Sequence, residues 1–136
     1  MSKSPELGVC YYPEHWPEKM WITDAENMHK NGITWVRIAE FAWSRIEPSS
    51  GVFEWNWLDK IVNILGKHGL KIVMCTPTAT PPKWLVDQMP DMVAIDENGQ
   101  ARKFGSRRHY SFSHIGYQQE SQRITKAIAE RYGQNN

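Results

Sequence analysis

The sequence predicts an α/β protein in which about three strand–helix (βα) units form the N-terminal portion of a TIM, or (β/α)8, barrel. Short apolar runs of strand length alternate with amphipathic stretches of helix length, which is typical of parallel sheets. Connections after the helices are short, whereas those after the strands are long and rich in Trp, Tyr, Glu, Arg and His. Barrel enzymes carry their active sites on such loops. The first strand–helix connection lacks a Gly-rich phosphate-binding pattern, which argues against a nucleotide-binding sheet.

The first unit is predicted for residues 7–32. Residues 7–11 are a short apolar run that ends before Pro13, which is typical of a buried strand. Pro17 fits the first position of a helix and Gly32 fits its end, because apolar residues recur every three to four positions between them. The expected face of this helix consists of Trp21, Ile22, Ala25, Met28 and His29.

The second unit begins at residues 33–38, which are rich in β-branched and aromatic residues and therefore predict a strand. A long polar and aromatic loop follows. The next helix is indicated by Asn56 as its cap, by Asp59 three residues later and by Gly69 after its end. Its apolar stripe consists of Leu58, Ile61, Val62 and Leu65. Residues 70–75 predict the third strand.

The connection after the third strand is irregular. Residues 76–82 hold three prolines, which argues against regular structure, and residues 83–88 could add a helical turn. Residues 92–104 predict a small hairpin because Asn98-Gly99 stands at their middle. A last helix is expected to end near Gly133, with Tyr117, Ser121, Ile124 and Ile128 on one face.

Three units are fewer than a closed barrel needs, since a (β/α)8 barrel has eight units and about 250 residues. We therefore expect residues 1–136 to be a partial barrel domain, truncated before strand four. Open sheet edges would then make the isolated piece poorly soluble.

Composition and charge favour a globular protein of the cytoplasm. A formal net charge of +1 gives no field that would hold nucleic acid or an anionic membrane. Residues 1–7 are polar and do not resemble a signal peptide. Cys10 and Cys75 lack the close Cys or His pairing of zinc ligands, so we expect buried free thiols and no metal site.

The densest polar cluster runs from Gly105 to Tyr110 and contains Arg107, Arg108 and His109. A guanidinium can donate a bidentate pair of hydrogen bonds to vicinal hydroxyls, as sugar recognition requires. A solvated basic loop is the alternative, and the residues alone leave both open. Seven tryptophans would suit core packing or stacking on sugar rings.

Charged residues are also expected at the ends of the first two strands. Arg37 lies within the second strand and Glu40 just past its end, where a buried Arg would need a carboxylate partner, structural or catalytic. Glu14 and His15 follow the first strand and could form an acid–base pair, although a capping role is at least as well supported. Glycoside hydrolysis needs two suitably spaced carboxylates, and the sequence shows no convincing pair.

At these residues the chain resembles glycoside hydrolase family 42, the β-galactosidases. The matching stretches are residues 7–16, Val36-Arg37-Ile38, residues 40–44, Ile46-Glu47-Pro48, Trp57-Leu58-Asp59, residues 76–82 with Trp84-Leu85, and residues 105–110. The resemblance implies a retaining enzyme that removes terminal β-D-galactose, built on a barrel with two further domains and assembled as a homotrimer.

The resemblance also implies roles for individual residues. The acid/base and nucleophile glutamates of the family follow strands four and seven, so both would fall beyond Asn136 and the chain would hold no catalytic residue. Arg107 matches the Arg that binds galactose, and Arg37, Glu40 and His109 are candidates for its supporting shell. Some members carry a structural zinc whose first Cys ligand is replaced here by Ser111, so we expect neither zinc nor another cofactor.

Two other interpretations stay open. A non-catalytic sugar-binding module could use Arg107 and the tryptophans, but three units offer few enclosing walls for a small ligand. A complete small α/β structural protein would instead unfold cooperatively as a monomer.

Overall fold

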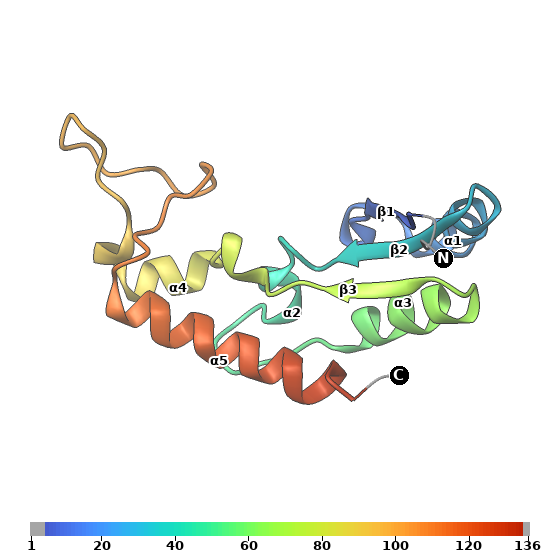
Figure 1. Cartoon of the computed structure of the whole chain (residues 1–136). Helices are drawn as coiled ribbons and strands as arrows, with labels where there is room; N and C mark the ends of the chain where they lie inside the picture. Colours follow the sequence, from blue (N-terminus) through green and yellow to red (C-terminus); the bar gives the residue numbers. More distant parts are fainter. Residues whose placement is uncertain (1–4, 135–136) are drawn as a thin grey trace. The chain divides into compact units, whose positions relative to one another are not determined.

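The computed structural model describes residues 5–134, and the chain divides into two compact units (Figure 1). The first unit holds the chain up to Ala39 together with Glu54–Cys75. The second unit holds Glu40–Phe53 together with the chain from Thr76 onward.

The first unit is a parallel sheet with helices beside it. Its strands are β1 (Leu7–Cys10), β2 (Ile33–Ile38) and β3 (Lys71–Met74), in the order β1-β2-β3. Helix α1 (Trp21–Lys30) connects the first two strands and α3 (Asn56–Lys67) precedes the third. All pairs are parallel, as the alternation of strand-like and helix-like segments predicts.

One face of this sheet is covered and the other is open. Val36 and Ile38 are fully buried, and the buried side chains of α1 and α3 complete this core, namely Trp21, Ala25, Trp57, Leu58, Ile61 and Leu65. Successive strand residues point to opposite faces, so Trp35, Arg37 and Val73 share the other face and are exposed.

Four details of the first unit differ from the sequence-based predictions. Strand β1 was predicted to be buried, but all four of its residues are exposed because it is an edge strand. The predicted cap Asn56 is the first residue of α3, whose N-cap Trp55 makes no side-chain capping bond. Ile22, which is 52% exposed, and His29, which is also exposed, do not lie on the buried face of α1 as predicted. The thiols predicted to be buried are not, since Cys10 is exposed and Cys75 is half-buried.

The second unit is built from short helices and one long one. They are α2 (Trp43–Ile46), α4 (Lys83–Gln88) and α5 (Ile115–Tyr132). Helix α4 has the predicted bounds, whereas α2 lies in the segment expected to be a loop. Residues 76–82, expected to be irregular, include a 3-10 turn at Pro77–Ala79, which a proline can start because its missing N–H has no partner there.

The predicted hairpin is present as isolated bridges rather than strands. Ile95 pairs with Ala101 across the Asn98-Gly99 turn, and Gly99 has a φ of +74°. A second bridge joins Val93 to Tyr110, so the hairpin folds back beside the polar cluster at residues 105–110. Figure 1 shows this segment as a long projection before α5.

Helix α5 follows its predicted face. Its buried residues are Tyr117, Ile124 and Ile128, and the side chain of His114 caps its start by accepting a hydrogen bond from the Tyr117 N–H at 3.1 Å. The Tyr117 hydroxyl donates to the Thr78 carbonyl at 2.8 Å. Among the described residues, no helix is both long and apolar enough to cross a membrane.

Tyr117 predicts an alkaline loss of stability. Burial raises its pKa from 10.0 to about 12, so the folded chain keeps a proton that the unfolded chain releases between these values. Its contribution is therefore complete below pH 10 and is lost as the pH rises through 12. We expect a loss of about 1–2 kcal/mol across this window, because one pKa unit is worth about 1.4 kcal/mol and solvent screens part of it.

Urea unfolding of the chain at several alkaline pH values would measure this loss. Tyr117→Phe should reduce the alkaline loss of stability, to which Tyr11 also contributes because burial raises its pKa, whereas Tyr132→Phe, a change to a half-buried tyrosine at the end of the same helix, should leave the loss unchanged. An equal slope in the Tyr117→Phe variant would contradict the prediction.

Candidate active site

The second unit contains a cavity of about 650 Å³. Three of the four site residues predicted from the sequence line it, namely Glu40, Arg107 and His109. The other lining residues are Phe41, Ser44, residues 79–82, residues 104–106, Arg108 and Tyr110. The loops after two predicted strands therefore contribute to one concave site, as expected for the active-site end of a barrel.

Hydrogen bonds within its own loop hold the segment that carries Arg107. Both the N–H and the hydroxyl of Ser106 donate to the Lys103 carbonyl, and Arg102 donates to the Arg107 carbonyl at 3.1 Å. Gly105 has a φ of +84° and Arg108 a φ of +55°, so the chain turns sharply on both sides of Arg107. The Arg107 side chain is exposed and can offer its donors to a ligand in the cavity.

His109 is buried, with 3% of its surface exposed. Its Nδ1 lies 3.0 Å from the Ser106 carbonyl oxygen, which can only accept, so Nδ1 carries a proton and donates. In the neutral ring Nε2 is then an acceptor, and this buried atom has no hydrogen-bond partner among the described residues. His109 also closes the loop that carries Arg107.

Glu40 and Arg37 lie in different units. Ala39 has a φ of +69°, unusual for a residue with a Cβ, and this turn directs the chain from β2 to the half-buried Glu40. Arg37 does not line the cavity. Its guanidinium lies on the open face of the first unit's sheet, where Nε is 2.9 Å from Cys75 Sγ and Nη1 is 3.8 Å from Cys10 Sγ.

Glu14 and His15 also belong to the first unit. They form a 3-10 turn with Pro13, and the ring of His15 stacks on Tyr12 with centroids 5.7 Å apart. Neither residue lines the cavity of the second unit.

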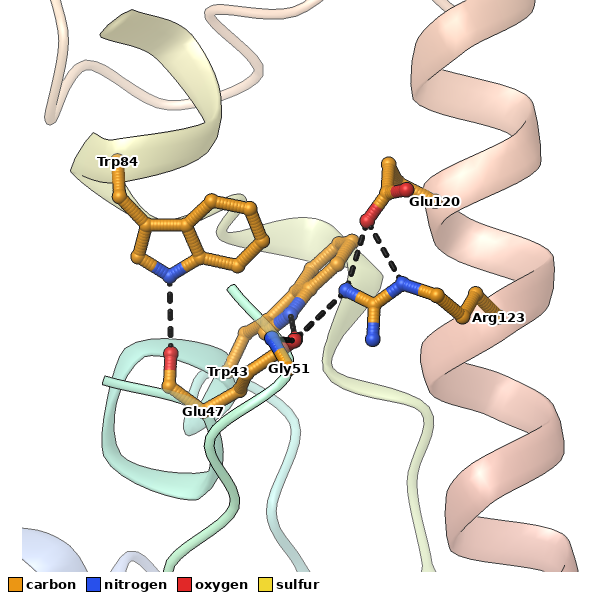
Figure 2. A network of polar contacts seen from close by, with 6 residues as sticks. All are labelled: Trp43, Glu47, Gly51, Trp84, Glu120 and Arg123. Atoms are coloured by element: carbon orange, nitrogen blue, oxygen red, sulfur yellow. Dashed lines mark hydrogen bonds and ion pairs between the residues drawn. The ribbon is translucent and has the colours of Figure 1, made fainter. Parts of the chain in front are cut away.

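A buried carboxylate supports the second unit (Figure 2). Glu47 is fully buried and accepts hydrogen bonds from the Trp43 indole at 2.9 Å and the Gly51 N–H at 2.7 Å. Arg123 Nη2 lies 2.8 and 2.9 Å from its two oxygens. The Glu47 carbonyl accepts from the Trp84 indole at 2.9 Å. One residue thereby joins α2, α4 and α5.

Sequence reasoning missed the partner of Glu47. Arg123 also donates to Glu120 at 2.7 and 2.8 Å, and its hydrogen bond to Glu47 is the main cause that raises the pKa of Arg123. Glu47 stands between Ile46 and Pro48, and its partner Arg123 lies 76 positions away, so no local pattern indicates the pair. Both carboxylate oxygens of Glu47 already accept hydrogen bonds from protein groups, so we interpret Glu47 as structural rather than catalytic.

The match to a known family decides the identity of the fold. Residues 10–136 match the family model Glyco_hydro_42, described as "Beta-galactosidase". The chain belongs to glycoside hydrolase family 42. The family predicted from the sequence motifs is thereby confirmed.

Known beta-galactosidases and their solved structures match almost the whole chain. A beta-galactosidase of Thermus thermophilus is 54% identical over 127 residues, which are 93% of this chain and 20% of the relative. The crystal structure of the Marinomonas ef1 beta-galactosidase matches with a TM-score of 0.93 at 54% identity, over 96% of this chain and 20% of that one. The Halorubrum lacusprofundi beta-galactosidase matches with a TM-score of 0.92 at 47% identity, over 96% and 20%.

These matches confirm the fold class, an α/β portion of a (β/α)8 barrel. The chain spans about a fifth of the length of the curated relatives that it matches. The domain bounds 1–136, the end before strand four and the roles of the four site residues stay predictions.

The zinc expectation also stays a prediction. Among the described residues, no group of three or more His, Cys, Asp or Glu side chains could hold a metal ion. The backbone N–H of Ser111, the residue on which this prediction rests, donates to the Met92 carbonyl at 2.7 Å.

Proposed function

We propose that the chain forms part of the sugar-binding site of an enzyme that hydrolyses terminal, non-reducing β-D-galactose residues of β-D-galactosides by retaining double displacement. The observation that carries the proposal is the shared cavity. Arg107, Glu40 and His109 line it together in a chain whose residues 10–136 match the β-galactosidase family.

The donors and acceptors of this cavity suit a neutral, hydroxyl-rich ligand. Arg107 offers a planar set of donors, which can bond two adjacent hydroxyl oxygens of a pyranose. Glu40 offers carboxylate acceptors for hydroxyl protons, and Ser44 offers a hydroxyl that can do either. No pair of carboxylates in the cavity lining is available for acid catalysis and nucleophilic attack, so both would come from elsewhere in the enzyme.

A hybrid enzyme tests the proposal. In it, residues 10–136 of this chain replace the segment with which they align in the Thermus thermophilus beta-galactosidase. We expect the hybrid to hydrolyse a chromogenic β-galactoside, the same relative without the segment to be inactive, and the 136-residue chain alone to be inactive because it lacks the carboxylate pair. Hydrolysis by the chain alone would contradict this location of the chemistry.

An inactive hybrid that folds would also count against the proposal. Galactose-dependent tryptophan fluorescence of the isolated chain, lost in Arg107→Ala, would in that case favour the non-catalytic sugar-binding module.

We further propose a cytoplasmic homotrimer without zinc or another cofactor and without nucleic-acid or membrane partners.

A further inference from the structure

We propose that Phe104 and Phe41 form the binding platform for the aglycone, the group attached to galactose in the substrate. This inference rests on the proposed function and assigns it a specificity determinant. The two phenylalanines line the same cavity as Arg107, so one site presents a polar wall and an apolar wall.

The size of the cavity leaves space beside the galactose ring. At about 650 Å³ it falls within the roughly 300–1,000 Å³ of pockets that enclose drug-sized ligands, which are larger than one sugar ring. If Arg107 and Glu40 bind the hydroxyls of galactose, the apolar residues of the lining, Phe41, Phe104, Pro81 and Pro82, are left for the rest of the substrate. An aryl group or the C–H face of a second sugar suits that wall.

Both phenylalanines of the cavity lining are exposed. Phe41 is 42% exposed and Phe104 is 47% exposed, whereas the neighbouring prolines 81 and 82 are buried. Exposed apolar side chains in a concave, polar-rimmed site mark a surface that a ligand covers. Each ring would lose contact with water when an aglycone binds.

Phe104 is held in place rather than loosely exposed. Its ring makes an edge-to-face contact with His109 at 5.4 Å between centroids, and His109 is anchored by the hydrogen bond to the Ser106 carbonyl. Lys83 Nζ lies 6.0 Å from the centroid of the Phe104 ring. A fixed ring binds a ligand with less loss of conformational entropy than a mobile one.

A platform for the aglycone predicts a specific kinetic pattern. Galactose itself does not reach the platform, so the affinity for galactose should not depend on either ring. Substrates with a large aglycone should depend on both rings, and methyl β-D-galactoside should not. A ring that only supports the fold would affect all substrates and galactose alike.

The test compares substrates in the hybrid enzyme. For Phe104→Ala we expect kcat/KM for p-nitrophenyl β-D-galactoside to fall about tenfold, the factor that corresponds to the loss of a well-placed aromatic contact. The value for methyl β-D-galactoside and the inhibition constant of galactose should stay within about twofold, and Phe41→Ala should act in the same direction. Phe112→Ala is the matched control, because Phe112 is 61% exposed in the same unit but does not line this cavity.

Two outcomes would overturn the platform while leaving the proposed function intact. One is an equal loss for aryl and methyl substrates in Phe104→Ala, and the other is no loss for either. Failure of the proposed function would look different, since Arg107→Ala would then leave galactose inhibition unchanged.

A second measurement uses the 136-residue chain itself. Saturation-transfer NMR with phenyl β-D-galactoside should show transfer to the phenyl protons that weakens in Phe104→Ala and persists in Phe112→Ala. Transfer that is equal in both variants would overturn the platform, whether or not the hybrid is active.

Discussion

Replacing Glu47 by Ala is expected to destabilise the second unit by about 2–5 kcal/mol, because the Trp43 indole and the Gly51 N–H lose their acceptor, and each buried donor left without a partner costs about 1–3 kcal/mol. Glu47 is fully buried, and its carboxylate accepts from Trp43, Gly51 and Arg123 (Figure 2). In the variant Trp43 and Gly51 would lose their acceptor, whereas Arg123 would keep Glu120. The loss would be a large fraction of the stability of an ordinary domain, which is about 5–15 kcal/mol.

Urea unfolding followed by tryptophan fluorescence measures this effect, because the indoles of Trp43 and Trp84 both bond to Glu47. Glu120→Ala is the matched control. It removes the other carboxylate bound to Arg123, but this carboxylate is 27% exposed and one helical turn away, so we expect a loss of about 1 kcal/mol or less.

A double variant measures how much of the loss comes from the Arg123 charge and the lost side-chain volume. Glu47→Leu with Arg123→Met removes both charges and keeps much of the apolar volume, so it should recover part of the stability lost in Glu47→Ala, while the Trp43 indole and the Gly51 N–H still lack their acceptor. If Glu47→Ala and Glu120→Ala were equally mild, Glu47 would not support this unit.

The contrast between Glu47 and α4 explains what sequence reasoning could and could not predict. Helix α4 has its predicted bounds because its signals are local, with prolines before Lys83 and Met89-Pro90 after its end. The alternation of segments likewise gave the parallel strands. The pairing of Glu47 with Arg123 depends on tertiary contacts, which leave no spacing to detect.

The candidate site likewise contains residues that the sequence predicted and residues that it did not. Glu40 could be predicted because it follows a strand, and loops after parallel strands meet at one end of the sheet. Arg107 and His109 were predicted from the resemblance of residues 105–110 to the family 42 motif, since the residues alone also fitted a solvated loop. Arg37 lies within a strand, so its side chain belongs to a sheet face rather than to a loop. The sequence could not show that Phe41 and Phe104 share the cavity, since isolated phenylalanines are most often core residues.

Arg107→Ala in the hybrid enzyme is expected to lower kcat/KM for β-galactosides by about 100- to 10,000-fold. Two hydrogen bonds from a charged donor are worth about 1.5–3 kcal/mol each when made to a bound ligand, and each 1.4 kcal/mol is a factor of ten. The loss should be equal for aryl and methyl galactosides, because Arg107 is proposed to bind the sugar that they share. Inhibition by galactose should weaken in parallel.

Arg107→Lys distinguishes geometry from charge. The lysine keeps the positive charge but cannot donate two parallel hydrogen bonds to adjacent hydroxyls, and a neutral sugar gains little from charge alone. We therefore expect Lys to recover less than a tenth of the lost activity, while Arg131→Ala, a change to an exposed arginine in the last turn of α5, leaves it unchanged. Full recovery by Lys would mean that the positive charge of Arg107, rather than the geometry of its hydrogen bonds, supports activity. Such a result would favour an anionic ligand over a galactoside.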